Sequence, residues 1–289
     1  MITLLDIRYV RLGTRDIEGA VRFAQEILGL SIGARSGNAK NREAVYLRSD
    51  NRDHTLVYVD GNPSEHTTGF EVRDEAELDA AAAELERLGY TVSVGNPEQC
   101  EARRVRAYIH FKDPSGNNID LVAGPHHCGV RFFPSRDAGS TGFSHIGLRS
   151  LNPAQDEKFW TTVLSAKVSD RIGAAPLLRI DEVHHKIALF PSAYAGVQHI
   201  NHQVESIDDI MRSWYLLKER GVKVVFGPGK HPTSSAMFLY FEGPDGMVFE
   251  YSSGVRSITD PNYQPRQFPF EASSFCMWGS KPDIAEFKD

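Results

Sequence analysis

A hairpin-like stretch near the end of the chain contains three residues that could do chemistry. From Gly229 to Tyr251 the sequence GKHPTSSAMFLYFEGPDGMVFEY predicts a strand, a tight turn at GPDG and a second strand, and it contains His231, Tyr240 and Glu250. Glu250 falls in the middle of the second strand between two aromatic residues. Because burying an unpaired carboxylate is costly, we expect Glu250 to be exposed, salt-bridged or bound to a metal ion.

The spacing within this stretch forms a signature. A Gly-x-His motif is followed by Tyr, Pro, Gly and Glu at fixed steps, which places the signature at His231, Tyr240, Pro244, Gly246 and Glu250. The pattern resembles the signature of the type I extradiol ring-cleavage dioxygenases, which belong to the vicinal oxygen chelate superfamily. The resemblance implies that Tyr240 hydrogen-bonds a metal-bound substrate oxygen and that His231 borders the substrate.

Four similar modules follow one another along the chain. Each predicts a strand, a helix and three further strands, and the turns DPSG and GPDG stand 130 residues apart in matching contexts. Apolar residues at three- and four-residue steps mark the helices, as at Ile17, Val21, Ala24 and Leu28. We therefore predict an α+β fold of four tandem βαβββ modules. The resemblance implies that these pair into two cupped, β-barrel-like domains, the vicinal oxygen chelate fold.

The repeat also predicts domain boundaries. We expect a non-catalytic N-terminal domain at residues 1–124, a connector at 125–141 and the catalytic domain at 142–256. The tail, residues 257–289, contains apolar residues among prolines, namely Phe268, Phe270, Phe275, Cys276 and Trp278. Since a free tail would expose this apolar surface, we expect it to pack on the body or on a neighbouring chain, with a mobile tail as the alternative.

Three candidate metal ligands fall on strands of the second half. His145 lies on the first strand of the third module, His199 on the first strand of the fourth, and Glu250 on the last strand of the fourth. Two histidines and one carboxylate on one face of a metal are typical of non-haem Fe(II) oxygenases. The resemblance implies that these three residues bind Fe(II), or Mn(II) as in some members of the family.

The corresponding positions of the first half lack such a set. By the repeat, the three ligand positions correspond to Tyr9, Thr67 and Asp120, of which only the aspartate is a good ligand. The same offset aligns His110 and Glu101 with the tyrosine and histidine of the hairpin. We therefore expect the first half to be structural, without a metal ion of its own.

A pair of histidines precedes the strand KIALF. In the family that the chain resembles, the second member of such a pair is the acid-base residue, which implies that His185 moves protons during the reaction. The spacing to His199 is one residue short, so His184 stays the alternative. His202 lies three residues after His199, and strand alternation favours the opposite face and a structural role for it.

Composition argues against several other classes of protein. The net charge is −6 and there is no basic run, so we expect no nucleic-acid partner. No segment approaches the roughly 18 apolar residues of a membrane span, and the N-terminus lacks the pattern of a signal peptide. Three scattered cysteines suit a reducing compartment. We expect a cytoplasmic protein without membrane partners, and a homo-oligomer, as is usual for soluble enzymes.

The resemblance implies an enzyme that opens the ring of a catechol-type substrate beside its two hydroxyls, with both atoms of dioxygen entering the product, in the breakdown of aromatic compounds. The partners would be a small aromatic diol and dioxygen. Two alternatives share the modules. One is a glyoxalase-like metal-dependent isomerase or lyase, whose ligands typically come from both halves of a paired site. The other is a metal-free small-molecule-binding module of the resistance-protein type, which would lack the three ligands.

Overall fold

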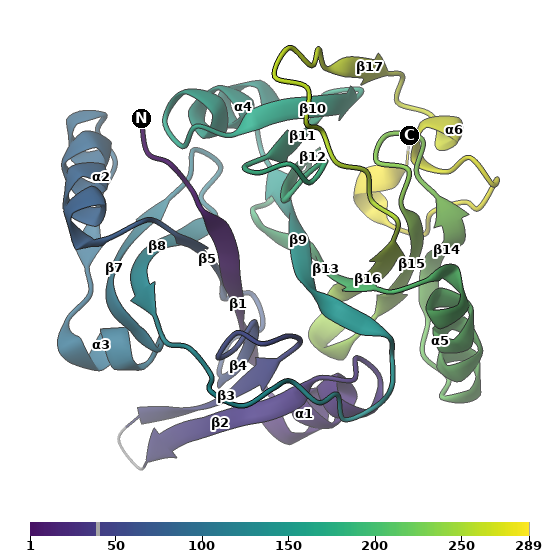
Figure 1. The fold of residues 1–289 in the computed structure, drawn as a ribbon, viewed down its shortest axis with the longest axis horizontal. Coiled ribbons are helices and arrows are strands. Elements are labelled where there is room, and N and C mark those ends of the chain that lie inside the picture. The colour runs from purple at the N-terminus through teal and green to yellow at the C-terminus, as the bar shows by residue number, and fades with distance from the viewer. Residues whose placement is uncertain (39–40, 289) are drawn as a thin grey trace.

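The computed structural model describes residues 1–38 and 41–288. Over these ranges two large sheets form the body of the protein, with the longer helices on their outer sides (Figure 1). The predicted α+β fold class is confirmed, and each half opens with a strand, a helix and three strands as expected. No helix within the described ranges is long and apolar enough to cross a membrane.

The first half forms a sheet with the strand order β2-β3-β4-β1-β5-β8-β7-β6. Asp16 and Asp74 each accept a hydrogen bond from a backbone N–H in the first turn of a helix, and so start α1 and α2. The short helix α3, which Asn96 caps, is an addition to the predicted module. The elements in chain order are β1 (Asp6–Thr14), α1 (Ile17–Glu26), β2 (Ser31–Asn38), β3 (Asn41–Arg48), β4 (Leu56–Asp60), β5 (His66–Glu71), α2 (Glu75–Arg87), β6 (Ser93–Val94), α3 (Pro97–Glu101), β7 (Val105–Lys112) and β8 (Asn118–Pro125).

The second half forms a sheet with the order β14-β15-β16-β13-β9-β12-β11-β10-β17. Helix α4 starts after the cap Asn152, as the sequence predicts, and Ser206 and Asp209 form a capping box at the start of α5. The elements are β9 (Ser140–Ser150), α4 (Pro153–Thr162), β10 (Lys167–Ile172), β11 (Ala175–Arg179), β12 (Ile187–Pro191), β13 (Gly196–Val204), α5 (Ile207–Glu219), β14 (Val224–Lys230), β15 (Met237–Glu242), η1 (Pro244–Gly246), β16 (Val248–Ser253), β17 (Arg266–Phe268), α6 (Ala272–Phe275) and η2 (Ala285–Phe287).

Strand pairing repeats from one half to the other. Strand β1 pairs parallel with β4 and antiparallel with β5, and β9 pairs parallel with β12 and antiparallel with β13. In the same way β5 is parallel to β8, and β13 is parallel to β16. Strands β9, β13 and β16 are therefore neighbours in the middle of the second sheet. Side chains on a common face of these strands lie close together.

One apolar core runs through both halves. The ring of Phe23 on α1 packs against Phe249 on β16, with ring centroids 5.8 Å apart. Trp160 on α4 packs edge-on against Phe70 on β5 at 5.4 Å. The first helix of each half therefore covers a strand of the other half. The predicted domain boundaries stay a prediction.

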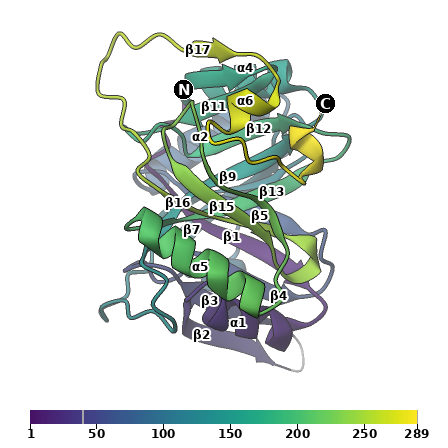
Figure 2. The same ribbon diagram turned by 90° about the vertical axis from the view of Figure 1, so that its right-hand side faces the viewer.

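The C-terminal tail packs against the second half, where it is the yellow segment of Figure 2. Its strand β17 extends the second sheet by pairing with β10. Phe275 and Phe287 are buried in an apolar cluster with Phe226 and Tyr240. Trp278, in contrast, is 53% exposed. The tail therefore covers the apolar face beside Tyr240.

Candidate metal centre and active site

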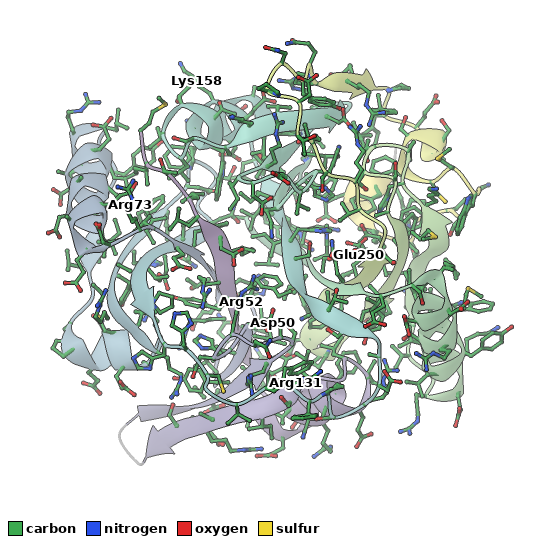
Figure 3. All side chains as sticks on the ribbon, in the orientation of Figure 1. Asp50, Arg52, Arg73, Arg131, Lys158 and Glu250 are labelled. Atoms are coloured by element: carbon green, nitrogen blue, oxygen red, sulfur yellow. The ribbon has the colours of Figure 1, made fainter. Side chains whose placement is uncertain are left out.

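Three buried side chains converge from the middle strands of the second sheet. His145 lies on β9, His199 on β13 and Glu250 on β16, and none is more than 5% exposed. The Nε2 atom of His145 lies 3.1 Å from Nε2 of His199 and 2.9 Å from Oε2 of Glu250. The Nε2 atom of His199 lies 3.5 Å from the same oxygen. Figure 3 marks Glu250 among the side chains of the second half.

The spacing of these three atoms fits a divalent metal ion. Ligands bound at about 2.1 Å and at right angles to one another lie about 3.0 Å apart, which matches two of the distances in the cluster, 3.1 Å and 2.9 Å, while the third, 3.5 Å, corresponds to a wider angle at the metal. Oε2 of Glu250 is buried and has no hydrogen-bond partner, although it faces both imidazoles. Such an orphaned carboxylate oxygen is expensive unless a cation is bound. The three residues therefore fit one metal ion held on one face.

The neighbours of His199 fix its ring tautomer, so that Nε2 is free to bind a metal. The Nδ1 atom of His199 contacts the side-chain oxygen of Gln198, which fixes the ring proton on Nδ1 and leaves a lone pair on Nε2. A register shift between Val197 and His199 brings these neighbouring side chains together. Gly147 lies opposite on β9, where a Cβ atom would be 2.4 Å from Nδ1 of His199. Gln198 and Gly147 have no signal of their own in the sequence.

The electrostatics of the cluster also favour metal binding. Burial lowers the pKa of His199 to about 3, so its imidazole is neutral at pH 7. Burial alone would raise the pKa of Glu250, but His145, followed by His231 and His199, holds that pKa well below its usual range. A neutral imidazole and an ionised carboxylate are the forms that bind metals.

The hairpin brings the two other signature residues beside the cluster. Tyr240 on β15 pairs across with Glu250, and its hydroxyl lies 3.2 Å from Nε2 of His231. The Nδ1–H of His231 donates to the backbone carbonyl of Phe275 at 2.7 Å, and Nε2 of His231 lies 3.6 Å from Glu250. Burial, reinforced by Glu250, raises the pKa of Tyr240 well above its usual value, so the phenol keeps its proton. Tyr240 can therefore donate a hydrogen bond.

The two adjacent histidines, His184 and His185, have different neighbours. His185 packs against His145, with ring centroids 4.3 Å apart. His184 is fully buried, and its Nε2 atom lies 2.8 Å from Oδ2 of Asp170 on β10. His185 is therefore the member of the pair that touches a candidate ligand. Its role as acid-base residue stays a prediction, and Asp170 is a residue that the sequence pattern did not single out.

His202 lies outside the ligand cluster. A second register shift follows Asn201 on β13, and the His202 ring packs between Phe143 and Phe249, with centroids 6.1 Å and 6.5 Å away. Neither ring nitrogen has a hydrogen-bond partner. Burial, followed by the proximity of His145, lowers the pKa of His202 to about 3. The ring is neutral and packs as part of the core.

In the first half, an arginine side chain neutralises the carboxylate at the position equivalent to Glu250. Oδ2 of Asp120 accepts hydrogen bonds from Tyr9 at 2.9 Å and from the guanidinium of Arg103 at 2.6 Å. Its other oxygen lies 2.8 Å from Nδ1 of His110. Arg103 thus supplies the positive charge that this buried carboxylate needs. Among the described residues, the group whose ligand atoms could hold a metal is His145, His199 and Glu250.

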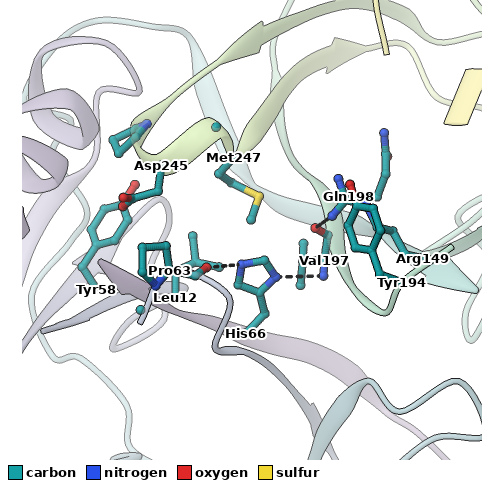
Figure 4. A pocket seen from close by; sticks show the side chains of 13 residues that line it. Leu12, Tyr58, Pro63, His66, Arg149, Tyr194, Val197, Gln198, Asp245 and Met247 are labelled. Atoms are coloured by element: carbon teal, nitrogen blue, oxygen red, sulfur yellow. Dashed lines mark hydrogen bonds between the residues drawn. The ribbon is translucent and has the colours of Figure 1, made fainter. Parts of the chain in front are cut away.

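A cavity of about 210 Å³ lies between the two halves (Figure 4). His66 lines this cavity and links the two halves. Its Nε2–H donates to the carbonyl of Pro63 at 2.8 Å, and its Nδ1 accepts from the N–H of Val197 at 3.1 Å. Gln198 borders this cavity and also contacts the candidate ligand His199. The cavity is lined from both halves by residues that include Leu12, Tyr58, His66, Arg149, Tyr194 and Met247.

The fold and the site define a family. The model of the Glyoxalase/Bleomycin resistance protein/Dioxygenase superfamily matches residues 6–121 and 142–251. The chain belongs to this superfamily. The two matched ranges correspond to the two halves of the fold, and the second contains all three candidate ligands. The resemblance indicated by the hairpin signature is confirmed.

Relatives and solved structures agree with this assignment. An iron-dependent extradiol dioxygenase of Rhodococcus jostii (strain RHA1) is 24% identical over 96% of this chain and 97% of its own length. A manganese-dependent 2,3-dihydroxybiphenyl 1,2-dioxygenase of Geobacillus genomosp. 3 is 24% identical over 89% of this chain and 87% of its own. The crystal structure of BphC, a halotolerant catechol dioxygenase, superposes with a TM-score of 0.87 at 23% identity, covering 100% of this chain and 98% of that one.

A second structural neighbour is named for a different activity. The Mn(II)-bound glyoxalase from Novosphingobium aromaticivorans has a TM-score of 0.86 at 24% identity and covers 100% of this chain and 95% of its own. At these identities the structural likeness shows the fold alone, and the type of reaction has to be inferred from the residues of the site. The predicted vicinal oxygen chelate architecture is confirmed by both neighbours.

Proposed function

We propose that the chain is an extradiol dioxygenase, which opens a catechol-type ring beside its two hydroxyls and places both atoms of dioxygen in the product. The observation that carries the proposal is the spacing of His145, His199 and Glu250, because three ligands on one face leave the opposite positions of a metal free. The relatives named for iron and for manganese support Fe(II) or Mn(II) as the ion.

The substrate class follows from the relatives and from the surroundings of the site. Relatives act on biphenyl-2,3-diol and 1,2-dihydroxynaphthalene, as their names state. In this chain, aromatic rings stand beside the ligands: Phe190 is 6.0 Å from His199 between ring centroids, and Phe287 is 4.7 Å from Phe190. Apolar walls with a few polar groups suit an aromatic diol.

The side chains around the ligands have distinct proposed roles. A bound Fe(II) ion supplies the charge that lowers the pKa of the diol and the redox activity that dioxygen requires. Tyr240 keeps its proton and donates a hydrogen bond to a substrate oxygen. His231, held by the carbonyl of Phe275, borders the substrate through Nε2. His185 takes a proton from a hydroxyl of the diol and returns it to an oxygen atom later in the reaction.

The glyoxalase alternative is less well supported. Such enzymes typically draw metal ligands from both halves of a paired site, whereas in this chain the three ligand positions lie in one half. In the first half Arg103 neutralises Asp120 where a second ligand set would be needed. A metal-free binding module would not need three converging ligands with an orphaned carboxylate oxygen.

Dioxygen uptake on a panel of catechols tests the proposal. The Fe(II)-loaded protein should consume dioxygen with 2,3-dihydroxybiphenyl, 1,2-dihydroxynaphthalene or a simpler catechol and yield a coloured ring-opened product. Isomerisation of a hemithioacetal without dioxygen uptake would favour the glyoxalase reaction instead. Absence of both reactions and of bound metal would favour the binding module.

We further propose a cytoplasmic homo-oligomer without nucleic-acid or membrane partners, in which residues 142–256 are catalytic and residues 1–124 are not. The net charge of −6 supports the absence of a nucleic-acid partner. Exposed apolar side chains such as Val130 and Phe133, at 65% and 67%, support contacts between copies. Light scattering after size exclusion measures the oligomeric state, and a monomer would refute that part.

A further inference from the structure

A row of buried polar contacts leads away from the metal centre. His185 packs on His145, and its Nδ1 atom lies 3.0 Å from Nδ1 of His184. The Nε2 atom of His184 lies 2.8 Å from Oδ2 of Asp170. His184 and Asp170 are both fully buried, so water does not compete for these hydrogen bonds.

Each hydrogen bond in this row contains one proton. The charge of Asp170, at the end of the row, decides which nitrogen has that proton. An ionised Asp170 only accepts, so the proton of His184 lies on Nε2. The Nδ1 atom of His184 then has a lone pair and accepts a hydrogen bond from Nδ1–H of His185. A neutral His185 with its proton on Nδ1 has its lone pair on Nε2.

Several donors keep Asp170 ionised. The guanidinium of Arg266 contacts both carboxylate oxygens, at 3.1 Å and 2.7 Å, and the backbone N–H of Arg266 donates at 2.9 Å. The Tyr263 hydroxyl donates at 3.0 Å. Burial alone would raise the pKa of Asp170, but His184 and Arg266 hold it well below its usual range. Burial also lowers the pKa of His184, which keeps that ring neutral with a single proton.

We propose that Asp170 and His184 are positioning residues that fix the tautomer of His185, so that Nε2 of His185 is the base available to the substrate. The inference rests on the proposed function, since it assigns His185 a proton-transfer role. His184 then acts through His185 and does not touch the substrate itself. The arrangement resembles a Ser-His-Asp triad in logic, because a buried carboxylate decides which ring nitrogen of the reacting histidine has the proton.

The C-terminal tail supplies part of this arrangement. Arg266 and Tyr263, which hold Asp170, both lie in the tail. The tail also provides the carbonyl of Phe275, which accepts from Nδ1–H of His231 and leaves Nε2 of that ring facing Tyr240. His185 and His231 are therefore both held through Nδ1, with Nε2 left for the substrate.

The first half offers a matched control. Strand β4 pairs with β1 as β12 pairs with β9, which makes His54 the equivalent of His185. His54 stacks on Tyr9 and contacts Asp53 directly at 3.1 Å, and Arg104 holds Asp53 in turn. This is a similar group of a histidine, an aspartate and an arginine, without the intervening second histidine, and it lies in the first half. Asp53→Asn therefore removes a largely buried carboxylate that is hydrogen-bonded to a histidine and an arginine, without changing the row at His185.

Ring-nitrogen NMR on protein with isotope-labelled histidine reads the tautomer directly, with Zn(II) in place of Fe(II). We expect the proton of His185 on Nδ1 in the parent protein and in Asp53→Asn. In Asp170→Asn the acceptor charge is lost, so protonation of Nε2 of His185 should become detectable. With Fe(II), turnover of a catechol should fall about 100-fold in Asp170→Asn, with little change in KM.

A pair of variants at His184 provides a second test if Asp170→Asn does not fold. His184→Gln supplies a carbonyl oxygen to Nδ1–H of His185 and should keep the tautomer and turnover within about tenfold of the parent, whereas His184→Leu should lose both. An unchanged His185 tautomer and unchanged turnover in Asp170→Asn or His184→Leu would overturn the inference. If the parent protein opens no catechol, the proposed function fails, but the tautomers can still be read.

Discussion

Asp120 and Glu250 occupy equivalent positions in the two halves but have different partners. Each is paired across a hairpin with the residue ten positions earlier, His110 and Tyr240 respectively. Asp120 is neutralised by the guanidinium of Arg103 at 2.6 Å. Glu250 instead faces two imidazoles with one oxygen unpartnered. A buried carboxylate needs a positive charge in either case, and among the described residues the group that could hold a metal ion lies in the second half.

The first prediction concerns metal content. His145→Ala, His199→Ala and Glu250→Ala should each lose the bound ion and ring cleavage together, because two remaining ligands hold a metal poorly. Elemental analysis of purified protein should give one divalent ion per parent chain. Asp120→Asn serves as the control and should keep that ion. Full occupancy in any of the three alanine variants would show that the ligand set is wrong.

The second prediction separates proton transfer from metal binding. His185→Gln should keep about one metal ion per chain and still bind catechol, because His185 packs on the candidate ligand His145 and is not part of the proposed ligand set. Turnover should fall about 100- to 10,000-fold, the usual contribution of a general acid-base residue. Steady-state kinetics and anaerobic catechol binding measure the two effects separately.

The outcome at the neighbouring histidine decides between the two candidates. If His185→Gln turns over normally and His184→Gln does not, then His184 is the base. If neither substitution matters, a residue other than these two histidines moves the proton.

The sequence could predict the positions of the ligands better than their surroundings. The module repeat and the hairpin signature indicate which strands bear His145, His199 and Glu250, because periodicity reports the face on which a side chain lies. The contact between Gln198 and His199 depends on a register shift, which no local pattern announces.

Contacts between segments that are distant in the sequence could not be predicted either. Asp170 meets His184 from another strand, and the carbonyl of Phe275 reaches His231 across 44 positions of sequence. These contacts are set by how the tail and the strands pack in three dimensions. The fold class could be predicted from the repeat, whereas the polar partners that set the tautomers could not.

The third prediction concerns the tail. Phe275 is 2% exposed and packs on Phe287, with ring centroids 5.0 Å apart. Phe275→Ala should lower the free energy of unfolding by about 3–5 kcal/mol, the usual cost of removing a buried aromatic side chain. Trp278→Ala, three residues further along the chain and 53% exposed, is the matched control and should change stability by about 0.5 kcal/mol or less. Denaturant titration distinguishes a packed tail from a mobile one, for which both variants would be neutral.

The fourth prediction concerns stability at acidic pH. Burial lowers the pKa of His202 to about 3, while an unfolded histidine titrates near pH 6.5. Between these values the unfolded chain takes up a proton that the folded chain does not. Stability is therefore lost as pH falls below about 6.5, with a contribution of about 1.4 kcal/mol per pH unit from this group.

The substitution His202→Phe isolates that contribution. Phenylalanine fits between Phe143 and Phe249 and removes two buried nitrogens without partners, so stability at pH 7.5 should be equal or higher. The slope of unfolding free energy against pH between about pH 6 and pH 4 should decrease by the equivalent of one proton. An unchanged slope would mean that the folded protein also protonates His202 in this range.

Stoichiometry of dioxygen uptake tests the central claim most directly. Protein loaded with one Fe(II) per chain is given a catechol and isotope-labelled dioxygen, and uptake, ring-opened product and label are measured together. We expect one dioxygen consumed per ring opened, both labelled atoms in the product, and a rate that follows iron content and vanishes in His145→Ala. A fully iron-loaded protein that binds a catechol but neither consumes dioxygen nor opens the ring would contradict it.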